Sequence, residues 1–477
     1  MNAPTLWSVA EAAAATNGQG QGDWRASGVS TDSRTVQQGD LFVAIQGPKF
    51  NGHRFAADAL ERGAAAVMVH EQPNDLASDA PVLMVANTMA GLEALGVAAR
   101  ARTTAKIAAV TGSVGKTGTK EALLRVLASV APTHASQGNL NNHWGVPLSL
   151  SRMPADSVYG VFELGMNHAG EITPLSRMVR PHVAIITNVE LVHLEFFASL
   201  CKIADAKAEI FAGLQPGGVA ILNRDNTYFT HLETAAKAAG AGRIISFGAH
   251  EAAEVRLIEL AQHPTCNCIF ADIDGQAVTY KIGAPGRHWA INSLAVLAAV
   301  RALSADLGLA ALAMADVSPT SGRGARHRVD YGDGSILIID ESYNASPVAV
   351  AAAIETLGVV EVDKLGRRIA VLGDMLEMGP ASPGLHADLA PALVSAGADL
   401  VFACGPSMAN LFEALPGHMR GRYESTSADL LPRVIAAVQA GDTVLVKGSL
   451  GIAMAPIVRA LLELGPNSDA NASAVRG

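Results

Sequence analysis

The chain has 477 residues, a formal net charge of −9 and 49% hydrophobic residues, and at about 150 residues per domain its length predicts three domains. The apolar content excludes a disordered chain, and the acidic balance argues against a nucleic-acid-binding protein, which usually carries a basic face. No apolar stretch approaches the ~20 residues that a membrane-spanning helix needs, and the first residues lack the positively charged region of a signal peptide.

Residues 1–102 alternate short apolar runs with turn signals. Strands are predicted over 40–45 and 64–69, and a short helix over 55–63 lies between them. Alternating strands and helices are typical of a small α/β unit, so this segment is predicted to form the first domain.

Residues 103–320 carry stronger strand signals. Near-continuous apolar strands are predicted over 106–111, 158–163, 183–188 and 218–222, and helical periods over 117–129 and 203–212 separate them. This pattern indicates a parallel sheet that helices cover on both faces. Beyond Arg224 the chain shows only shorter strand patterns until a helix predicted over 290–304.

Proline, serine and glycine mark a boundary over 318–324, and the third segment is taken as 321–477. Its strand candidates lie over 335–340, 368–373, 400–404 and 442–447, separated by helical stretches. They predict a second doubly wound, Rossmann-like domain, followed by a tail after Pro466 that we expect to fray. The predicted class is α/β with three domains: a small α/β domain, a central phosphate-loop domain with a parallel sheet, and the Rossmann-like domain.

A phosphate loop is predicted where the first strand of the central segment ends. The residues Thr111-Gly112-Ser113-Val114-Gly115-Lys116-Thr117-Gly118 follow that strand and open a helix. Small residues let backbone N–H groups turn toward phosphate oxygens, and the helix N-terminus adds partial positive charge. Lys116 is placed to reach the outer phosphates, and the Thr117 hydroxyl to coordinate Mg²⁺. The common form of this loop has glycine at position 110, where this chain has valine.

Three charged or titratable residues have both a functional and an ordinary interpretation. Glu163 ends an apolar strand, so its carboxylate is expected at the carboxyl edge of the sheet, where it could share a Mg²⁺ with Thr117 or merely cap the next helix. His193, a lone histidine after the strand over 183–188, is by itself more typical of a structural residue. Lys207, with charges on either side in a helical pattern, is by itself typical of a solvated helix face.

The phosphate loop, Thr-Gly-Ser-Val-Gly-Lys-Thr, resembles that of the Mur ligases, the ATP-dependent amide-forming enzymes of peptidoglycan synthesis. Further segments are similar to motifs of the same family, and they lie over 138–147, 163–167, 187–190, 340–347 and 372–379. The resemblance extends from Ser30 to Val458, nearly the whole chain. This set of motifs is far more specific than a phosphate loop alone.

The resemblance implies two Mg²⁺ ions and a carbamylated lysine. The residues of the family that match Glu163 and His193 hold metal, and the one that matches Lys207 carries the carbamate, which converts a cation into an anion able to hold Mg²⁺. With Thr117 these residues form the implied metal set. The implied catalytic residues are Lys116, His193 and Lys207.

The resemblance also implies contacts with ATP and with the two ends of the substrate. The ATP contacts are Gly112, Ser113, Val114, Gly115, Lys116, Thr117, Gly118, Asn292 near the adenine, Arg326 at the phosphates and Asp340 near the ribose and hinge. The substrate contacts are Ser33, Arg34 and Lys49 at the uridine diphosphate, Asn139 and Asn141 in the asparagine-rich stretch, and Lys447 toward the incoming amine. Without the family resemblance, Arg326 is one member of a basic cluster. Arg34 and Lys49 are then as typical of plain surface residues as of residues that hold a diphosphate. Trp289 and Ala325 depart from the residues that many relatives carry, asparagine and glycine.

The implied activity is the ATP-dependent joining of D-alanyl-D-alanine to UDP-N-acetylmuramoyl-tripeptide through an acyl phosphate. The four cysteines lack the spacing of a zinc site, as expected for reduced thiols in a cytosolic protein. We therefore expect a cytoplasmic monomer that binds these two substrates, ATP and Mg²⁺, with no nucleic acid and no membrane insertion.

Four alternative functions stay open at this point. A ligase that adds the third amino acid shares the fold, but the chain lacks the Asp-Asn-Pro-Arg motif of relatives that select diaminopimelate. Folylpolyglutamate synthase is a further relative without the uridine-nucleotide domain that residues 30–53 indicate. A non-catalytic nucleotide-binding scaffold would not need Lys116, Glu163 and Lys207 together, and an NTPase motor would need an arginine finger that we do not recognise.

Overall fold

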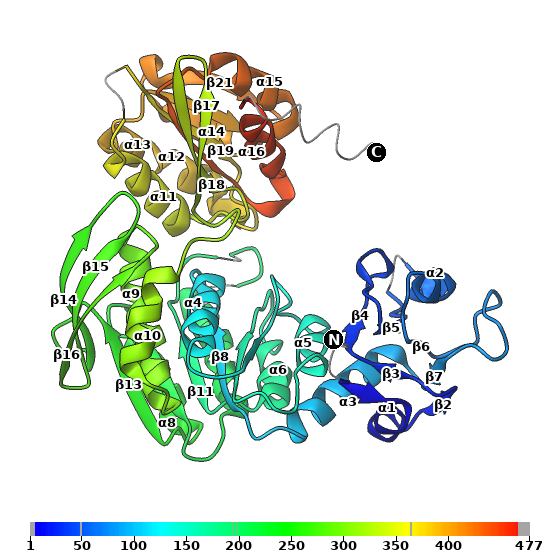
Figure 1. The fold of residues 1–477 in the computed structure, drawn as a ribbon. Helices are drawn as coiled ribbons and strands as arrows, with labels where there is room; N and C mark the ends of the chain where they lie inside the picture. The colour runs from blue at the N-terminus through cyan, green and yellow to red at the C-terminus, as the bar shows by residue number, and fades with distance from the viewer. Residues whose placement is uncertain (1–4, 48–49, 193, 198, 363–364, 466–477) are drawn as a thin grey trace.

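Three large β-sheets, with a small two-stranded one formed by the first and third strands, organise the chain in the computed structural model, which describes residues 5–47, 50–192, 194–197, 199–362 and 365–465. Each sheet belongs to an α/β domain, so the predicted class is confirmed. The first and third domains lie on different sides of the central one (Figure 1).

The N-terminal domain is built on a five-stranded sheet of order β2-β7-β6-β5-β4. Its strands and helices are β1 (Trp7–Ser8), α1 (Val9–Thr16), β2 (Gln19–Gln21), β3 (Arg25–Ala26), β4 (Gly28–Ser30), η1 (Ser33–Thr35), β5 (Asp40–Val43), η2 (Gly52–Phe55), α2 (Ala56–Glu61), β6 (Ala66–Val69), β7 (Val82–Met84) and α3 (Thr88–Ala101). Strands β4 to β7 run parallel. The segments after β4, β5 and β6 therefore meet at one edge, the carboxyl edge of this sheet.

The central domain carries a nine-stranded sheet of order β16-β15-β14-β13-β12-β11-β8-β10-β9. Its elements are β8 (Lys106–Thr111), α4 (Lys116–Ala128), β9 (Thr133–Ala135), α5 (Gly145–Ser151), β10 (Tyr159–Glu163), α6 (Ile172–Val179), β11 (Val183–Ile186), α7 (Leu200–Ala208), η3 (Glu209–Gly213), β12 (Val219–Asn223), α8 (Phe229–Ala238), β13 (Arg243–Gly248), β14 (Val255–Gln262), β15 (Asn267–Ile273), β16 (Gln276–Ile282), α9 (Arg287–Ala302), α10 (Leu307–Ala313) and η4 (Met314–Asp316). The strands from β9 to β14 pair in parallel, and β15 and β16 extend the sheet antiparallel.

Alternate residues of strand β8 face two different cores. Ala108 and Val110 pack with α4 and α9, whereas Ile107 and Ala109 pack with α5 to α8 on the other face. Every β8 residue from Ile107 to Thr111 is buried. A near-continuous apolar run is what a strand covered on both faces requires, so the prediction for this sheet is confirmed.

The stretch beyond Arg224 differs from the prediction in one respect. Helix α8 precedes the strands there, and its buried residues include Phe229, Leu232 and Ala236. The strands β13 to β16 then continue the central sheet. The apolar spacing of α8 is short, and the many strand-forming residues that follow it conceal it in the sequence.

The C-terminal domain has a six-stranded sheet of order β17-β18-β22-β19-β20-β21. Its elements are β17 (Ala325–Tyr331), β18 (Gly334–Glu341), α11 (Pro347–Val359), β19 (Arg368–Gly373), η5 (Gly379–Ala381), α12 (Ser382–Ala387), α13 (Ala390–Ser395), β20 (Leu400–Cys404), α14 (Met408–Ala414), η6 (Gly417–Met419), β21 (Arg420–Glu424), α15 (Ser427–Ala437), β22 (Thr443–Lys447), η7 (Leu450–Ile452) and α16 (Ala455–Leu462). Only β17 is antiparallel to its neighbour.

Contacts of two segments fix the N-terminal domain to the central domain: its first described residues, and the end of helix α3, which links the two domains. The Trp7 indole N–H donates to the Ser151 carbonyl at 2.9 Å. The Arg102 guanidinium lies 4.1 Å from the Trp7 ring centre and donates to the Leu6 carbonyl at 2.6 Å. These buried contacts join the end of α3 to the end of α5.

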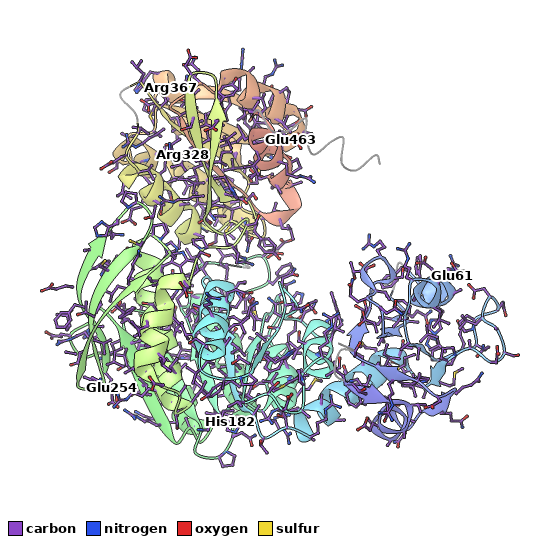
Figure 2. All side chains as sticks on the ribbon, in the orientation of Figure 1. Glu61, His182, Glu254, Arg328, Arg367 and Glu463 are labelled. Atoms are coloured by element: carbon purple, nitrogen blue, oxygen red, sulfur yellow. The ribbon has the colours of Figure 1, made fainter. Side chains whose placement is uncertain are left out.

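The carboxyl edge of the central sheet faces the C-terminal domain. His182, which directly precedes β11, lies at the far end of the central domain, away from the C-terminal domain (Figure 2). The strands therefore run from that end toward the C-terminal domain. Across the described ranges, no helix combines the length and apolarity needed to cross a bilayer, and the four cysteines are free thiols.

Candidate active site

The loop between β8 and α4 is held by the segment that follows β11. The Ser113 N–H donates to the Asn188 carbonyl at 3.0 Å, and the Val114 N–H donates to the Asn188 side-chain Oδ1 at 3.0 Å. The Ser113 hydroxyl donates to the Glu190 carbonyl at 3.1 Å and accepts from the Glu190 N–H at 2.9 Å. Because β8 and β11 are parallel neighbours, these two segments meet at the carboxyl edge of the sheet.

Two positions of this loop require glycine. Gly112 has φ +149° and Gly115 has φ +83°, in the region that side chains disfavour. A Cβ atom on Gly115 would lie 2.6 Å from Nδ2 of Asn292, and one on Gly112 would overlap the Thr187 hydroxyl. Asn292, at the start of α9, therefore lies directly against the phosphate loop.

The first turn of α4 presents free backbone donors. Within the described ranges no side chain caps this helix, and the Thr119 N–H bonds back to the Gly115 carbonyl at 2.9 Å. The N–H groups of Lys116, Thr117 and Gly118 thus have no partner inside the helix. An anion at this helix N-terminus would satisfy them and gain from the helix dipole.

Two lysines meet at this edge. The Lys116 Nζ donates to the carbonyls of Gly112 at 2.8 Å and of Ser113 at 3.3 Å. Burial lowers the pKa of Lys116, the Glu163 carboxylate opposes that shift, and the Arg323 cation adds to it. Burial and the charge of Lys116 hold the pKa of Lys207 well below its usual range.

Lys207 is not the solvated lysine that its helical pattern alone indicates. It lies in α7 with 2% of its surface exposed. Within the described part of the chain, no hydrogen bond or ion pair of its amine is found. Burial therefore favours the uncharged form of this amine, which is its nucleophilic form.

Glu163 has one satisfied and one unsatisfied oxygen. It ends β10, in register with Val110 of β8, and is 2% exposed. Its Oε1 accepts from the Asn141 amide at 2.7 Å, whereas its buried Oε2 has no partner among the described residues. A buried carboxylate oxygen without a donor fits a cation, since hard divalent ions choose oxygen ligands.

The residues here fit a Mg²⁺ ion. Glu163 contributes the unsatisfied oxygen, and the buried Thr117 opens α4 after a strand that pairs directly with β10. The ammonium of Lys116 is close enough to Glu163 to shift its own pKa. His193, a further predicted ligand, lies outside the described residues.

Asp340 holds the hinge between the central and C-terminal domains. It is 2% exposed, and one of its oxygens accepts from the Gly322 N–H at 2.7 Å and the Ser321 hydroxyl at 3.1 Å. The other oxygen accepts from the hydroxyl and the N–H of Ser342, at 2.6 Å and 3.2 Å. These bonds occupy both carboxylate oxygens and tie the end of β18 to residues 321 and 322.

Two arginines of the C-terminal domain reach toward the central domain. Arg326 on β17 donates to the carbonyl of Pro264, in the loop between β14 and β15. Its Nε and Nη2 are buried without a partner among the described residues, and burial lowers its pKa. The Arg323 guanidinium lies 4.1 Å from the ring centre of Tyr343. Arg326 therefore retains donors for an anion, as its predicted phosphate contact needs.

Lys447 ends β22 and is already paired. Its Nζ donates to Glu341 Oε2 and to the Asn344 carbonyl, each at 3.0 Å. Lys447 is 3% exposed. It lies at the carboxyl edge of the C-terminal sheet, where a ligand would meet the Lys447–Glu341 pair.

The predicted substrate residues of the N-terminal domain lie apart from these groups. Arg34 pairs with Asp32 at 2.7 Å, and 83% of its side chain is exposed. Ser33 is buried beside it in η1, and Lys49 lies outside the described residues. Asn139 is exposed in the loop before α5, two residues from Asn141, which contacts Glu163.

A second contact joins the central and C-terminal domains. The Glu195 N–H donates to the Glu377 carbonyl at 3.1 Å, and Leu194 packs against the cores of both domains. The segment after β11 thus holds the phosphate loop with its first residues and the C-terminal domain with its later ones.

Several residues of the site were not singled out from the sequence. Asn188 and Glu190 lie in a recognised motif without an assigned role, and Arg323 was only one of a basic cluster. Their position directly after β11 is a usable signal for the first two. No sequence signal indicates that Trp289 packs on Gly118, where a Cβ atom would lie 2.9 Å from the indole ring.

Comparison with protein families gives three matches in chain order. Residues 25–103 match the Mur ligase family, catalytic domain; residues 110–300 match the Mur ligase middle domain; and residues 326–450 match the Mur ligase, glutamate ligase domain. Together these matches span most of the chain.

Two curated relatives cover nearly the whole chain. The UDP-N-acetylmuramoyl-tripeptide–D-alanyl-D-alanine ligase of Rickettsia prowazekii is 34% identical over 430 residues, which are 90% of this chain and 94% of the relative. The Escherichia coli protein of the same name is 34% identical over 450 residues, 94% and 97% of the two chains.

Solved structures agree in fold. A crystal structure of MurF from Acinetobacter baumannii superposes with a TM-score of 0.82 at 30% identity, covering 96% of this chain and 99% of that one. MurF ligase from Thermotoga maritima in complex with ADP gives 0.74 at 25% identity, covering 92% and 97%.

Proposed function

The chain belongs to the Mur ligase family, and we propose that it uses ATP to join D-alanyl-D-alanine to UDP-N-acetylmuramoyl-tripeptide in peptidoglycan precursor synthesis. The names of its relatives supply the substrates. The observation that carries the chemistry is the carboxyl edge of the central sheet. There the half-buried Lys116 meets the buried Lys207 and Glu163, and Glu163 Oε2 has no partner among the described residues.

The first step activates a carboxylate. An oxygen of the terminal carboxylate of the tripeptide attacks the γ-phosphorus of ATP, the bond to the β-phosphate oxygen breaks, and an acyl phosphate and ADP result. The free amides of α4 bind the phosphates, and the Lys116 ammonium leaves the carbonyls of Gly112 and Ser113 to stabilise the charge on the transferred group.

Thr117 and the unsatisfied oxygen of Glu163 would hold Mg²⁺, which supplies charge neutralisation between the anionic phosphates and the substrate carboxylate. Asn141 fixes the orientation of Glu163 through its bond to Oε1. The metal role of His193, and the presence of two ions, belong to this proposal on the resemblance alone.

The environment of Lys207 favours carbamylation. Its neutral amine nitrogen attacks the carbon of carbon dioxide, an N–C bond forms, and one proton leaves to solvent, which gives a carbamate anion. Lys116 disfavours a second cation at this position, and an anion there would be attracted by the same charge. The carbamate would then join Thr117 and Glu163 as a metal ligand.

The second step forms the amide. The amine of D-alanyl-D-alanine attacks the acyl carbon, and the tetrahedral intermediate collapses with release of phosphate and loss of a proton from nitrogen. Lys447 and Glu341 lie at the C-terminal sheet edge that would deliver this amine. The hinge that Asp340 holds allows the C-terminal domain to close over the acyl phosphate and exclude water.

The N-terminal domain would bind the uridine-diphosphate end of the nucleotide substrate. Arg34 and Ser33 follow β4 at a carboxyl edge, as ligand residues of parallel sheets do. The rigid contacts of Trp7 and Arg102 with the central domain would keep this end at a fixed separation from the ATP loop. We place the enzyme in the cytoplasm, as a monomer.

The test measures phosphate release by the purified protein with UDP-N-acetylmuramoyl-tripeptide, ATP and Mg²⁺ while amine acceptors are supplied one at a time. We expect release with D-alanyl-D-alanine and none with diaminopimelate, lysine or glutamate. Release without the dipeptide would contradict the proposal. A second assay supplies UDP-N-acetylmuramoyl-dipeptide and a single amino acid in place of the tripeptide nucleotide and D-alanyl-D-alanine. Phosphate release in that assay would favour the ligase that adds the third residue.

A further inference from the structure

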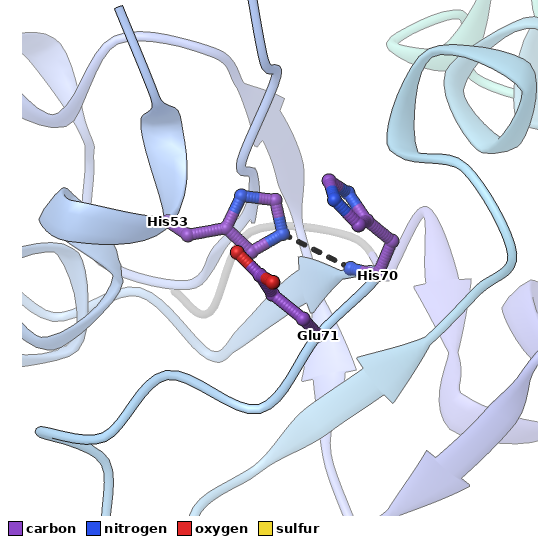
Figure 3. A group of neighbouring side chains, drawn as sticks. All are labelled: His53, His70 and Glu71. Carbon is purple, nitrogen blue, oxygen red and sulfur yellow. Dashed lines mark hydrogen bonds between the residues drawn. The ribbon is translucent and has the colours of Figure 1, made fainter.

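Two histidines and a glutamate meet at the carboxyl edge of the N-terminal sheet, far from the phosphate loop. His53 lies in η2, and His70 and Glu71 directly follow β6. One ligand atom from each lies within 4.8 Å of the other two, and Figure 3 shows the three side chains gathered together. We propose that these residues form a binding site for a transition-metal ion of the zinc type.

The surroundings of His53 fix which of its nitrogens can bind a metal. Its Nδ1 lies 2.9 Å from Oδ1 of Asn51, an oxygen that can only accept, so Nδ1 carries the proton. The lone pair is then on Nε2, which faces His70 (Figure 3). A histidine ligand whose other N–H is donated to an oxygen is the usual arrangement around protein-bound metals.

His53 is buried against the segment that carries the other two ligands. It is 3% exposed, and its ring centre lies 4.2 Å from that of His70. Its Nε2 accepts from the His70 backbone N–H at 3.1 Å. A metal on Nε2 would take the place of this backbone donor and leave the Asn51 bond intact.

His70 and Glu71 complete a set of two imidazoles and one carboxylate. The Nδ1 of His70 is buried and makes no hydrogen bond within the described ranges, so this nitrogen is available to a metal ion. Glu71 is exposed, which lets its carboxylate move to close the site. Tetrahedral zinc would bring the ligand atoms to roughly 3.4 Å from one another, given bonds near 2.0–2.1 Å, so each has to move only by about an ångström.

The donor set decides the class of ion. Two imidazole nitrogens and one carboxylate oxygen are typical of zinc sites with an open position, whereas magnesium and calcium prefer oxygen alone. A bound ion would link the segment of η2 to the end of β6, two neighbouring loops of the edge where the uridine nucleotide is proposed to bind.

The experiment titrates metal-free full-length protein with Zn²⁺ against a chromophoric chelator, with Mg²⁺ in excess so that the ATP site is filled. We expect one zinc equivalent, and at least tenfold weaker binding in both His70→Asn and Glu71→Gln. These two side chains are more exposed than His53, so their replacement spares the fold, which circular dichroism verifies. Substitution of Co²⁺ for Zn²⁺ should give visible absorption that both variants lack.

Two control variants make the result decisive. His418→Asn, at an exposed position of the C-terminal domain, should leave the affinity unchanged. Cys201, Asp205 and His231 form a second group of possible ligands on α7 and α8, and His231→Asn removes it. The proposal is overturned if wild-type protein binds no zinc, or if His231→Asn abolishes binding while His70→Asn and Glu71→Gln retain it.

Discussion

The central sheet and the N-terminal sheet both present loops at a carboxyl edge, but the charged side chains at the two edges differ in burial and in pairing. At the central edge Lys207 and Glu163 are buried beside the half-buried Lys116, and Glu163 Oε2 has no partner among the described residues. At the N-terminal edge Arg34 is largely exposed and already paired with Asp32. The first edge stores unfavourable electrostatics that a charged ligand would relieve, whereas the Arg34–Asp32 pair of the second edge does not.

We expect this difference to separate residues that act in the reaction, at the central edge, from residues that only bind the substrate, at the N-terminal edge. Buried, unsatisfied charges reduce the stability of the free protein and strengthen interactions with phosphates and metal in a site that excludes water. An exposed ion pair contributes little by itself. Substitutions at the central edge should therefore change kcat, whereas those at the N-terminal edge should change KM.

The largest expected effect follows from Lys116→Met. Removing the cation that faces the transferred phosphoryl group should lower kcat by about 10³-fold. Phosphate release under saturating substrates measures it, with Lys237→Met as the control, because that surface lysine only pairs with Glu233 on α8. Equal loss in both variants, or loss in neither, would contradict the role of Lys116.

Glu163→Gln should have the next largest effect. The amide replaces the carboxylate that is expected to hold Mg²⁺, so kcat should fall by about 10²-fold and the Mg²⁺ concentration for half-maximal rate should rise. Asn141→Ala, which leaves the carboxylate but frees its orientation, should cost only about tenfold. A magnesium dependence that is identical in all three proteins would rule out this metal site.

The sequence predicts those features of the central edge that depend on residues close together in the chain, and it misses those that depend on residues far apart. The strand before Gly112, the helix after Lys116 and the end of β10 at Glu163 follow from short-range patterns, so they were predicted. Asn188 bonds to a loop over 70 residues away in sequence, and Arg326 meets the carbonyl of Pro264 across a domain boundary. Such pairings arise from tertiary packing and leave no periodic signal.

Burial is the property that the sequence predicted least well. Lys207 looks like a surface residue because charged neighbours flank it, yet the turn of α7 places it inward. Arg34 looks like a free phosphate ligand, yet Asp32 two residues earlier pairs with it. In each case the outcome depends on the direction of a single side chain, which apolar periodicity does not determine.

Lys207→Met should raise stability near neutral pH. The pKa of Lys207 is lowered from its usual 10.5 in the folded protein, so between these two values the unfolded chain binds more protons than the folded one. The free energy of unfolding of the wild type then rises with pH across that window. In buffer free of carbon dioxide, calorimetry at neutral pH should show a melting temperature about 2–4 °C higher in the variant.

The matching comparison repeats the calorimetry above pH 10.5. At that pH the Lys207 amine is mostly neutral in both the folded and the unfolded chain. The difference in melting temperature between Lys207→Met and the wild type should therefore shrink. A constant difference at all pH values would mean that packing, and not the buried amine, sets the effect.

The smallest effect is expected at the N-terminal edge. Arg34→Ala removes an exposed ion pair that contributes little to stability, so the free energy of unfolding should hardly change. The KM for the nucleotide substrate should rise a few-fold with kcat unaltered, because the residue binds ground state and transition state alike. Asp32→Asn serves as the matched variant. A loss of kcat in Arg34→Ala would remove the distinction between the two edges.

The central claim is that ATP, metal and a modified lysine satisfy the unpartnered groups at the central edge, and a crystal structure with an ATP analogue and Mg²⁺ tests it most directly. It should show metal at Glu163 Oε2, Lys116 moved from the Gly112 and Ser113 carbonyls to the outer phosphates, and carbamate density on Lys207. An analogue bound elsewhere, or one bound here with Glu163 Oε2 and Lys207 unchanged, would contradict the account.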